Sequence, residues 1–183
     1  SDTDEKKGSF NNSGVFSAND FIVKAGSFVN TGTIHVNTLS LWTWSQLGGI
    51  INASESLTLN LQGYNKTVDD SLVLNAPILN IVDSGSQAGV VFSEQRQIEN
   101  VQEITVTSLG HKTGLIVDAG SNLTFKTVHL NHESTDEDAR VEIYATGYAH
   151  IKNLSVTGTK GMIQTNAGAV AKIDNIILDE NSI

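Results

Sequence analysis

FVNTGTIHVNTLSL, residues 28–41, restates with other letters the stretch FNNSGVFSANDFIV, which begins eighteen residues earlier at residue 10. In both copies an asparagine, and a glycine two positions later, precede a run of alternating apolar residues. A short period of this kind is typical of proteins built from stacked units, each of which buries its apolar residues against the next. The opening of the chain therefore predicts a stacked architecture.

The same unit can be followed along the whole sequence. A third copy, GGIINASESLTL, occupies residues 48–59 and has one residue added before its closing strand. Beyond it one element persists: an apolar residue, two residues of any kind, an apolar residue, one of any kind, and an apolar residue. Its eight copies end 18 to 26 residues apart and are Ala18/Phe21/Val23, Val36/Leu39/Leu41, Ser54/Leu57/Leu59, Ala76/Leu79/Ile81, Val101/Ile104/Val106, Phe125/Val128/Leu130, Ile151/Leu154/Val156 and Ile173/Ile176/Leu178.

The closing part of each unit alternates with period 2, the periodicity of a short β-strand whose outer two residues face the same way. No segment sustains the i, i+3, i+4, i+7 pattern of a helix. We therefore predict an all-β fold, a single-stranded parallel β-helix (solenoid) of about eight coils. With a rise of roughly 4.8 Å per coil, the stack would be a rod on the order of 40 Å long.

Alternation also predicts the environment of individual residues. In the second unit Phe28, Ile34, Val36, Leu39 and Leu41 face the core. Asn12, Gly14, Asn30, Gly32 and Gly49 are predicted at a corner where the backbone is left-handed or bulged, because asparagine and glycine tolerate such conformations best.

The middle residues of the eight triplets face outward and form one column: Ile22, Ser40, Thr58, Asn80, Thr105, His129, Ser155 and Ile177. The column is polar inside and apolar at both ends. This predicts a solvated sheet face whose ends are covered by something else.

Composition narrows the classes of partner. The formal net charge is -9 and the chain has two arginines, which argues against a nucleic-acid partner because phosphate binding needs a basic surface. Without cysteine there is no disulfide, thiolate zinc site or cysteine nucleophile. No apolar run approaches 18 residues, so we predict no membrane-spanning segment.

The N-terminus, SDTDEKKGSF, is polar where a signal peptide would be apolar. Either the protein is cytosolic, or the sequence is an internal piece of a longer exported chain. We predict a flexible polar tail over residues 1–7 and a single β-helix domain over residues 8–183, a fragment of a longer chain.

The pattern N-x-G-x-I-x-A/V-x-x-L-x-L, carried by residues 12–23, 30–41 and 48–59, resembles the haemagglutinin repeats of filamentous-haemagglutinin-like exoproteins. Bacteria export these proteins by two-partner secretion. The resemblance implies a right-handed β-helical stalk on a secreted or cell-surface protein, an adhesin or a contact-dependent growth inhibition exoprotein. It also implies an outer-membrane transporter as a partner. The Asn-Pro-Asn-Gly motif of that family's secretion domain is missing, and the second half of the chain is also compatible with fungal cell-wall adhesins and phage tail fibres.

Trp42 and Trp44 are the candidate ligand-binding residues. They follow directly on the inward residues Leu39 and Leu41, so continued alternation through Ser45 would place both rings on one outer face. Exposed paired indoles suit stacking on sugar rings or anchoring of a partner protein. The alternative is that a loop covers them or that the strand turns a corner first.

HLNHESTDEDAR, residues 129–140, is the most charged stretch and interrupts the coil pattern. His129, His132, Glu133 and Asp136 are weak candidates for metal ligands, since carboxylates suit calcium and imidazoles suit zinc. The spacing matches no EF-hand, and a solvated insertion loop explains the segment better. We therefore predict no metal and no cofactor.

Carbohydrate-cleaving β-helices need carboxylates clustered on one outer face. Asp69, Asp70, Asp83 and Asp118 fall in separate loops of the predicted coil, and neither Arg96 nor Arg140 lies in a triplet. We therefore predict a chain that is not an enzyme: a stalk or binding segment of a secreted or cell-surface adhesin-like protein. Its partner would be a protein or glycan on a host or neighbouring cell. A polysaccharide-processing enzyme or carbohydrate-binding module is the alternative.

Overall fold

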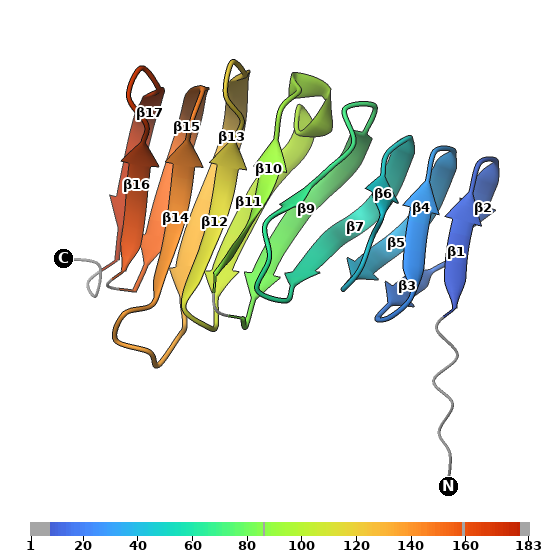
Figure 1. The fold of residues 1–183 in the computed structure, drawn as a ribbon. Helices are drawn as coiled ribbons and strands as arrows, with labels where there is room; N and C mark the ends of the chain where they lie inside the picture. The colour runs from blue at the N-terminus through green and yellow to red at the C-terminus, as the bar shows by residue number, and fades with distance from the viewer. Residues whose placement is uncertain (1–7, 86, 159, 180–183) are drawn as a thin grey trace, which may run out of the picture.

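The computed structural model describes residues 8–85, 87–158 and 160–179, and these residues form a β-solenoid of about eight turns (Figure 1). The predicted all-β stack is therefore confirmed. The single helical turn in this part of the chain is the 3-10 turn η1 (Gln95–Gln97), which interrupts the fifth coil. The predicted tail, residues 1–7, lies outside the described residues.

The strands of the described residues form three parallel sheets. The main sheet runs the full length of the stack, and each of its strands pairs with the strand one coil away. It contains β2 (Val15–Ser17), β3 (Asp20–Val23), β5 (Thr33–Leu41), β7 (Ile50–Leu61), β9 (Val73–Asp83), β11 (Asn100–Ser108), β13 (Asn122–His132), β15 (Tyr148–Thr157) and β17 (Val170–Leu178).

Two shorter sheets complete the coils. The first coils are completed by β1 (Ser9–Asn12), β4 (Ser27–Asn30) and β6 (Gln46–Leu47). The remaining coils are completed by the opposite sheet, which contains β8 (Lys66–Thr67), β10 (Ala88–Phe92), β12 (Lys112–Val117), β14 (Arg140–Ala145) and β16 (Gly161–Thr165). The core lies between these strands and the main sheet.

The closing triplets stack in the predicted register. Leu39 lies beside Phe21 in one neighbouring coil and beside Leu57 in the other, and both leucines are fully buried. One triplet was assigned wrongly: Ala53, not Ser54, occupies the position next to Val36. The added residue falls in the bend of β7, so Ser54 turns outward and its hydroxyl donates to Asn37 Oδ1 at 3.0 Å.

The corner after β1 and β4 works differently from the prediction. Asn30 is fully buried, and its Nδ2 donates to the carbonyl oxygens of Gly48 at 2.7 Å and Gly32 at 3.2 Å. Asn12 Nδ2 donates to Asn30 Oδ1 at 2.9 Å, which continues the ladder to the first coil. The asparagines are therefore needed for their amide groups, because each satisfies carbonyl groups inside the corner.

The glycines of this corner also have two separate roles. No residue other than glycine has a positive φ in the part of the chain that the structure describes, and of the corner glycines only Gly49, at φ 64°, does. Gly14 and Gly32 have ordinary backbone conformations. Gly32 is required by close packing, since a Cβ there would lie 2.2 Å from the carbonyl oxygen of Gly14.

The described residues include no helix that is long and apolar enough to cross a membrane.

Candidate functional site

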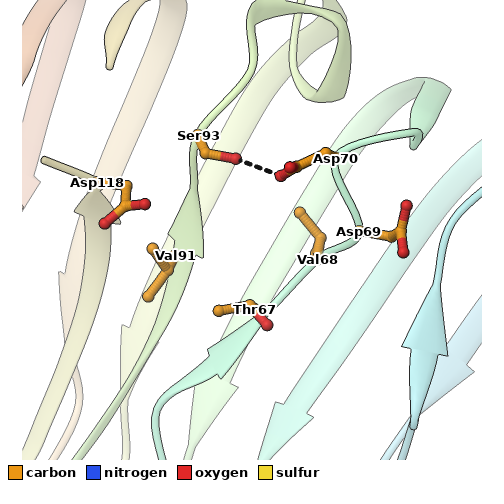
Figure 2. A pocket seen from close by; sticks show the side chains of 7 residues that line it. All are labelled: Thr67, Val68, Asp69, Asp70, Val91, Ser93 and Asp118. Atoms are coloured by element: carbon orange, nitrogen blue, oxygen red, sulfur yellow. Dashed lines mark hydrogen bonds between the residues drawn. The ribbon is translucent and has the colours of Figure 1, made fainter. Parts of the chain in front are cut away.

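A hollow of about 370 Å³ opens on the surface where β8, β10 and β12 end (Figure 2). It is lined by Thr67, Val68, Asp69, Asp70, Val91, Ser93 and Asp118. A second hollow of about 530 Å³ shares Asp70, Ser93 and Asp118 with it and continues along η1 and the turn at residues 119–122. We call the two together the acidic groove.

Stacking of the coils brings the side chains of the acidic groove together. Ser93 directly follows the buried Phe92, and Asp118 directly follows the buried Val117. Phe92 and Val117 are register partners, and the Asp118 amide donates to the Phe92 carbonyl oxygen at 3.0 Å. On the other side, the Ser93 hydroxyl donates to Asp70 Oδ1 at 2.9 Å (Figure 2).

The groove presents acceptors for hydroxyl groups. The carboxylates of Asp70 and Asp118 are exposed, and neither lysine nor arginine is among the lining residues of either hollow. The Asp69 carboxylate already has partners within the protein: it accepts hydrogen bonds from the hydroxyl and amide of Ser71 and from the side chain of Gln46. These bonds hold the pKa of Asp69 below its ordinary value, the Ser71 hydroxyl contributing most.

Asp69 and Asp70 follow β8 and Asp118 follows β12, so these three aspartates lie in separate loops as predicted, but stacking of the coils brings them to one hollow. Asp83, also predicted in a loop, is instead the buried last residue of β9. The sequence contains a pattern from which the proximity of Ser93 and Asp118 could have been predicted. Residues 89–93, GVVFS, and residues 114–118, GLIVD, are copies of one strand, so Ser93 and Asp118 occupy equivalent positions.

The outer face of the main sheet is a second candidate surface. Asn75 Nδ2 donates to Asn52 Oδ1 at 2.8 Å, and Asn100 Nδ2 donates to Asn75 Oδ1 at 2.7 Å. The predicted outward column of triplet residues is aligned as expected, from Ile22 through Ser40 to Ser155 and Ile177. We call these amide and hydroxyl columns the polar face.

Trp42 and Trp44 do not continue the alternation of β5, which ends at Leu41. Trp44 packs against the core, its Nε1 donates to the Thr67 carbonyl oxygen at 2.9 Å, and Lys66 Nζ lies 4.2 Å from its ring centroid. Trp42 lies instead beside Lys24, whose Nζ is 5.3 Å from the ring centroid. The premise of two rings on one continued strand is therefore wrong, and ligand binding by the two tryptophans stays a prediction.

The side chains named as candidate metal ligands contact different neighbours. His129 contacts Ser155 and lies 3.8 Å from Glu103 Oε2, and Glu133 accepts a hydrogen bond from Asn131. Asp136 Oδ2 lies 3.2 Å from His111 Nδ1, and the pKa of Asp136 is lowered mainly by the amide of Asp138. Within the described ranges, no group of three or more histidine, aspartate or glutamate side chains is placed to hold a metal ion.

His132 belongs to a buried polar column. It is the register partner of Ser108, which in turn pairs with Asp83, and Asp83 and Ser108 are fully buried. Asp83 Oδ1 accepts the amide groups of Gly63 at 3.2 Å and Gly85 at 2.8 Å. Burial raises the pKa of Asp83, and these two amides oppose the shift.

Replacing Asp83 with asparagine is expected to stabilise the chain at pH 7. A carboxyl whose folded-state pKa is raised stabilises the fold below its unfolded value, 3.8, and loses this contribution as the pH rises through the folded-state pKa. Asparagine keeps an oxygen for Gly63 and Gly85 but carries no charge. Urea denaturation from pH 3 to pH 8 checks this: the advantage of Asp83→Asn should vanish at the acid end, and an advantage independent of pH would contradict it.

The resemblance of the repeats to exoprotein haemagglutinin repeats is carried by residues 12–23, 30–41 and 48–59. Comparisons of the chain with protein-family models, curated proteins and solved structures found no match.

Proposed function

We propose that this chain is a β-helical stalk or binding segment of a secreted or cell-surface adhesin-like protein, which mediates adhesion or display. The observation that carries the proposal is the polar face, where amide and hydroxyl side chains repeat from coil to coil. Such a surface offers the same weak contact many times to a polymeric ligand. Linked weak contacts bind far more tightly than one of them alone.

The chemistry of the polar face fits a glycan better than a charged polymer. Asn80 and Thr105 are register partners whose side chains face outward, and each can both donate and accept hydrogen bonds. A partner on a host or neighbouring cell would therefore be a polysaccharide or a glycosylated protein. Export through an outer-membrane transporter is part of the same proposal and is supported by the repeat resemblance.

Binding of the purified chain to a glycan array and to intact cells tests the proposal. The double variant Asn80→Ala, Thr105→Ala should weaken binding about tenfold, since each lost hydrogen bond is worth about 0.5–1.5 kcal/mol. Gln164→Ala, an exposed position on the opposite sheet, is the matched control and should bind normally. Equal binding by all three proteins would exclude the polar face as the adhesive surface.

A polysaccharide-processing enzyme or carbohydrate-binding module is the second candidate, and the acidic groove favours it. Two exposed carboxylates and a serine on successive coils resemble the donor and acceptor sets that hold sugar hydroxyls. Asp70→Asn and Asp118→Asn separate the two candidates. Release of reducing ends by the parent protein, lost in both variants, would replace adhesion by catalysis. Glycan binding without turnover that both variants lose would indicate a carbohydrate-binding module, and binding that both variants keep would favour the stalk.

A further inference from the structure

One inward column of the main sheet is polar in three successive coils. Asp83, Ser108 and His132 are the last residues of β9, β11 and β13, and each is the register partner of the next. The coil before them places the buried Leu61 beside Asp83. The column two residues earlier on the same strands is apolar and buried, and consists of Ile81, Val106 and Leu130. The three polar residues therefore border apolar side chains on two sides.

Each residue of this column has a buried polar atom without a hydrogen-bonding partner in the described part of the chain. These atoms are Asp83 Oδ2, Ser108 Oγ and His132 Nε2. Asp83 and Ser108 are fully buried, so the surrounding solvent does not reach their side chains. The other carboxylate oxygen, Asp83 Oδ1, already accepts the amides of Gly63 and Gly85. Buried polar groups are almost always hydrogen-bonded, so three such atoms in one column indicate a bound ligand.

The spacing of the coils fits water as this ligand. Neighbouring parallel strands lie roughly 4.8 Å apart, which is too far for a direct hydrogen bond between equivalent atoms of short side chains. One water molecule spans this distance with two hydrogen bonds of about 2.8 Å each. The asparagines of the polar face need no such bridge, because the longer side chain of Asn75 reaches Asn52 directly at 2.8 Å.

The chemistry of the three atoms also favours water over a metal ion. An ionised carboxylate only accepts hydrogen bonds, whereas a serine hydroxyl and a histidine ring nitrogen can each donate or accept. Water can both donate and accept, so it can bond all three atoms. A metal ion would find one carboxylate and one imidazole here, and the described residues hold no group of three or more histidine, aspartate or glutamate side chains placed to bind a metal.

We propose that two buried water molecules bind in this column, one between Asp83 and Ser108 and one between Ser108 and His132. They join the three side chains into a single hydrogen-bonded chain. His132 also lines a surface hollow of about 520 Å³ together with Asp136 and Lys160, so the chain connects a fully buried carboxylate with the surface. It also holds three coils in register, because a shift of one residue would leave these polar atoms without their bridges.

Nuclear Overhauser spectroscopy of the unmodified protein tests the site directly. Long-lived buried waters give cross peaks of opposite sign in laboratory-frame and rotating-frame spectra, whereas surface waters exchange too fast to do so. The Ser108 Hβ protons and the His132 Hε1 proton, which is adjacent to Nε2, should both show such cross peaks to water. The ring of His35, which is exposed on β5, is the control and should show none. Absence of the cross peaks at either Ser108 or His132 overturns the proposal.

The variants Ser108→Val and Ser108→Thr separate loss of the hydroxyl from the change in volume. Valine and threonine have nearly the same shape, but only threonine keeps a hydroxyl group. The equilibrium constant for unfolding should be about tenfold larger for Ser108→Val than for Ser108→Thr, because Asp83 and His132 lose their connection. The water cross peak at Ser108 should persist at the threonine and vanish at the valine. Equal stabilities and equal water contacts in the two variants overturn the proposal.

Elemental analysis of the protein after dialysis against EDTA examines the other possible occupant. We expect no divalent metal to remain bound in this column. One equivalent of metal per chain that is retained by the unmodified protein and lost in His132→Ala would show a cation in place of the waters. That result also overturns the proposal.

Discussion

Replacing Leu39 with aspartate is expected to unfold the chain or to lower its free energy of unfolding by more than about 4 kcal/mol. Leu39 is fully buried between Phe21 and Leu57 of the adjacent coils, so the substitution removes apolar contacts and places a carboxylate in the core. Truncating a buried leucine to alanine already costs about 2–5 kcal/mol, and an unpaired charge adds to that cost.

Ser40→Asp is the matched control, one residue further along the same strand. Ser40 faces outward beside Ile22 and Thr58, so its substitution should change stability by no more than about 0.5–1 kcal/mol. Urea denaturation followed by circular dichroism measures both. Equal losses for the two variants would mean that the inward and outward positions of β5 have been interchanged.

Replacing Gly32 with alanine is expected to lower the free energy of unfolding by about 3 kcal/mol. A Cβ at this position would lie 2.2 Å from the Gly14 carbonyl oxygen and 2.7 Å from the Ser13 carbonyl carbon. Backbone atoms of the neighbouring coil cannot move aside as a flexible side chain could, so the coils would have to separate at this corner.

Gly14→Ala provides the comparison within the same column. Gly14 occupies the equivalent corner of the first coil, where no atom lies within 4 Å of the added Cβ. Since its φ is not positive, alanine should be tolerated there to within about 0.5–1 kcal/mol. Thermal unfolding of both variants checks this, and similar melting temperatures would refute the steric argument.

Gly14 and Gly32 show which properties of a residue the sequence predicts and which depend on the packing of the coils. That Gly14 and Gly32 are equivalent can be read from the sequence, because the N-x-G pattern repeats after eighteen residues. That only Gly32 is sterically confined depends on the packing of the coils, because its Cβ would meet the backbone of the first coil, whereas no described atom faces the Cβ of Gly14. A left-handed backbone, one of the two predicted reasons, holds for neither glycine.

The candidate sites likewise depend on contacts between coils that the sequence does not predict. The acidic groove joins Asp70, Ser93 and Asp118 from three successive coils, and the loops between these residues differ in length and sequence. The position of Trp44 could not be predicted from the sequence either. It packs against the core because β5 ends at Leu41 and because the Thr67 carbonyl oxygen of the next coil accepts a hydrogen bond from its indole N–H.

The sequence by itself determined the all-β class, the number of coils and the inward columns such as Leu39 and Leu41. It could do so because period-2 alternation and the spacing of the repeats are local properties of the chain. Only the tertiary structure decided the buried Asn30 ladder and the pairing of Asp70 with Ser93. These features arise from contacts between coils, and their geometry depends on how every intervening loop packs.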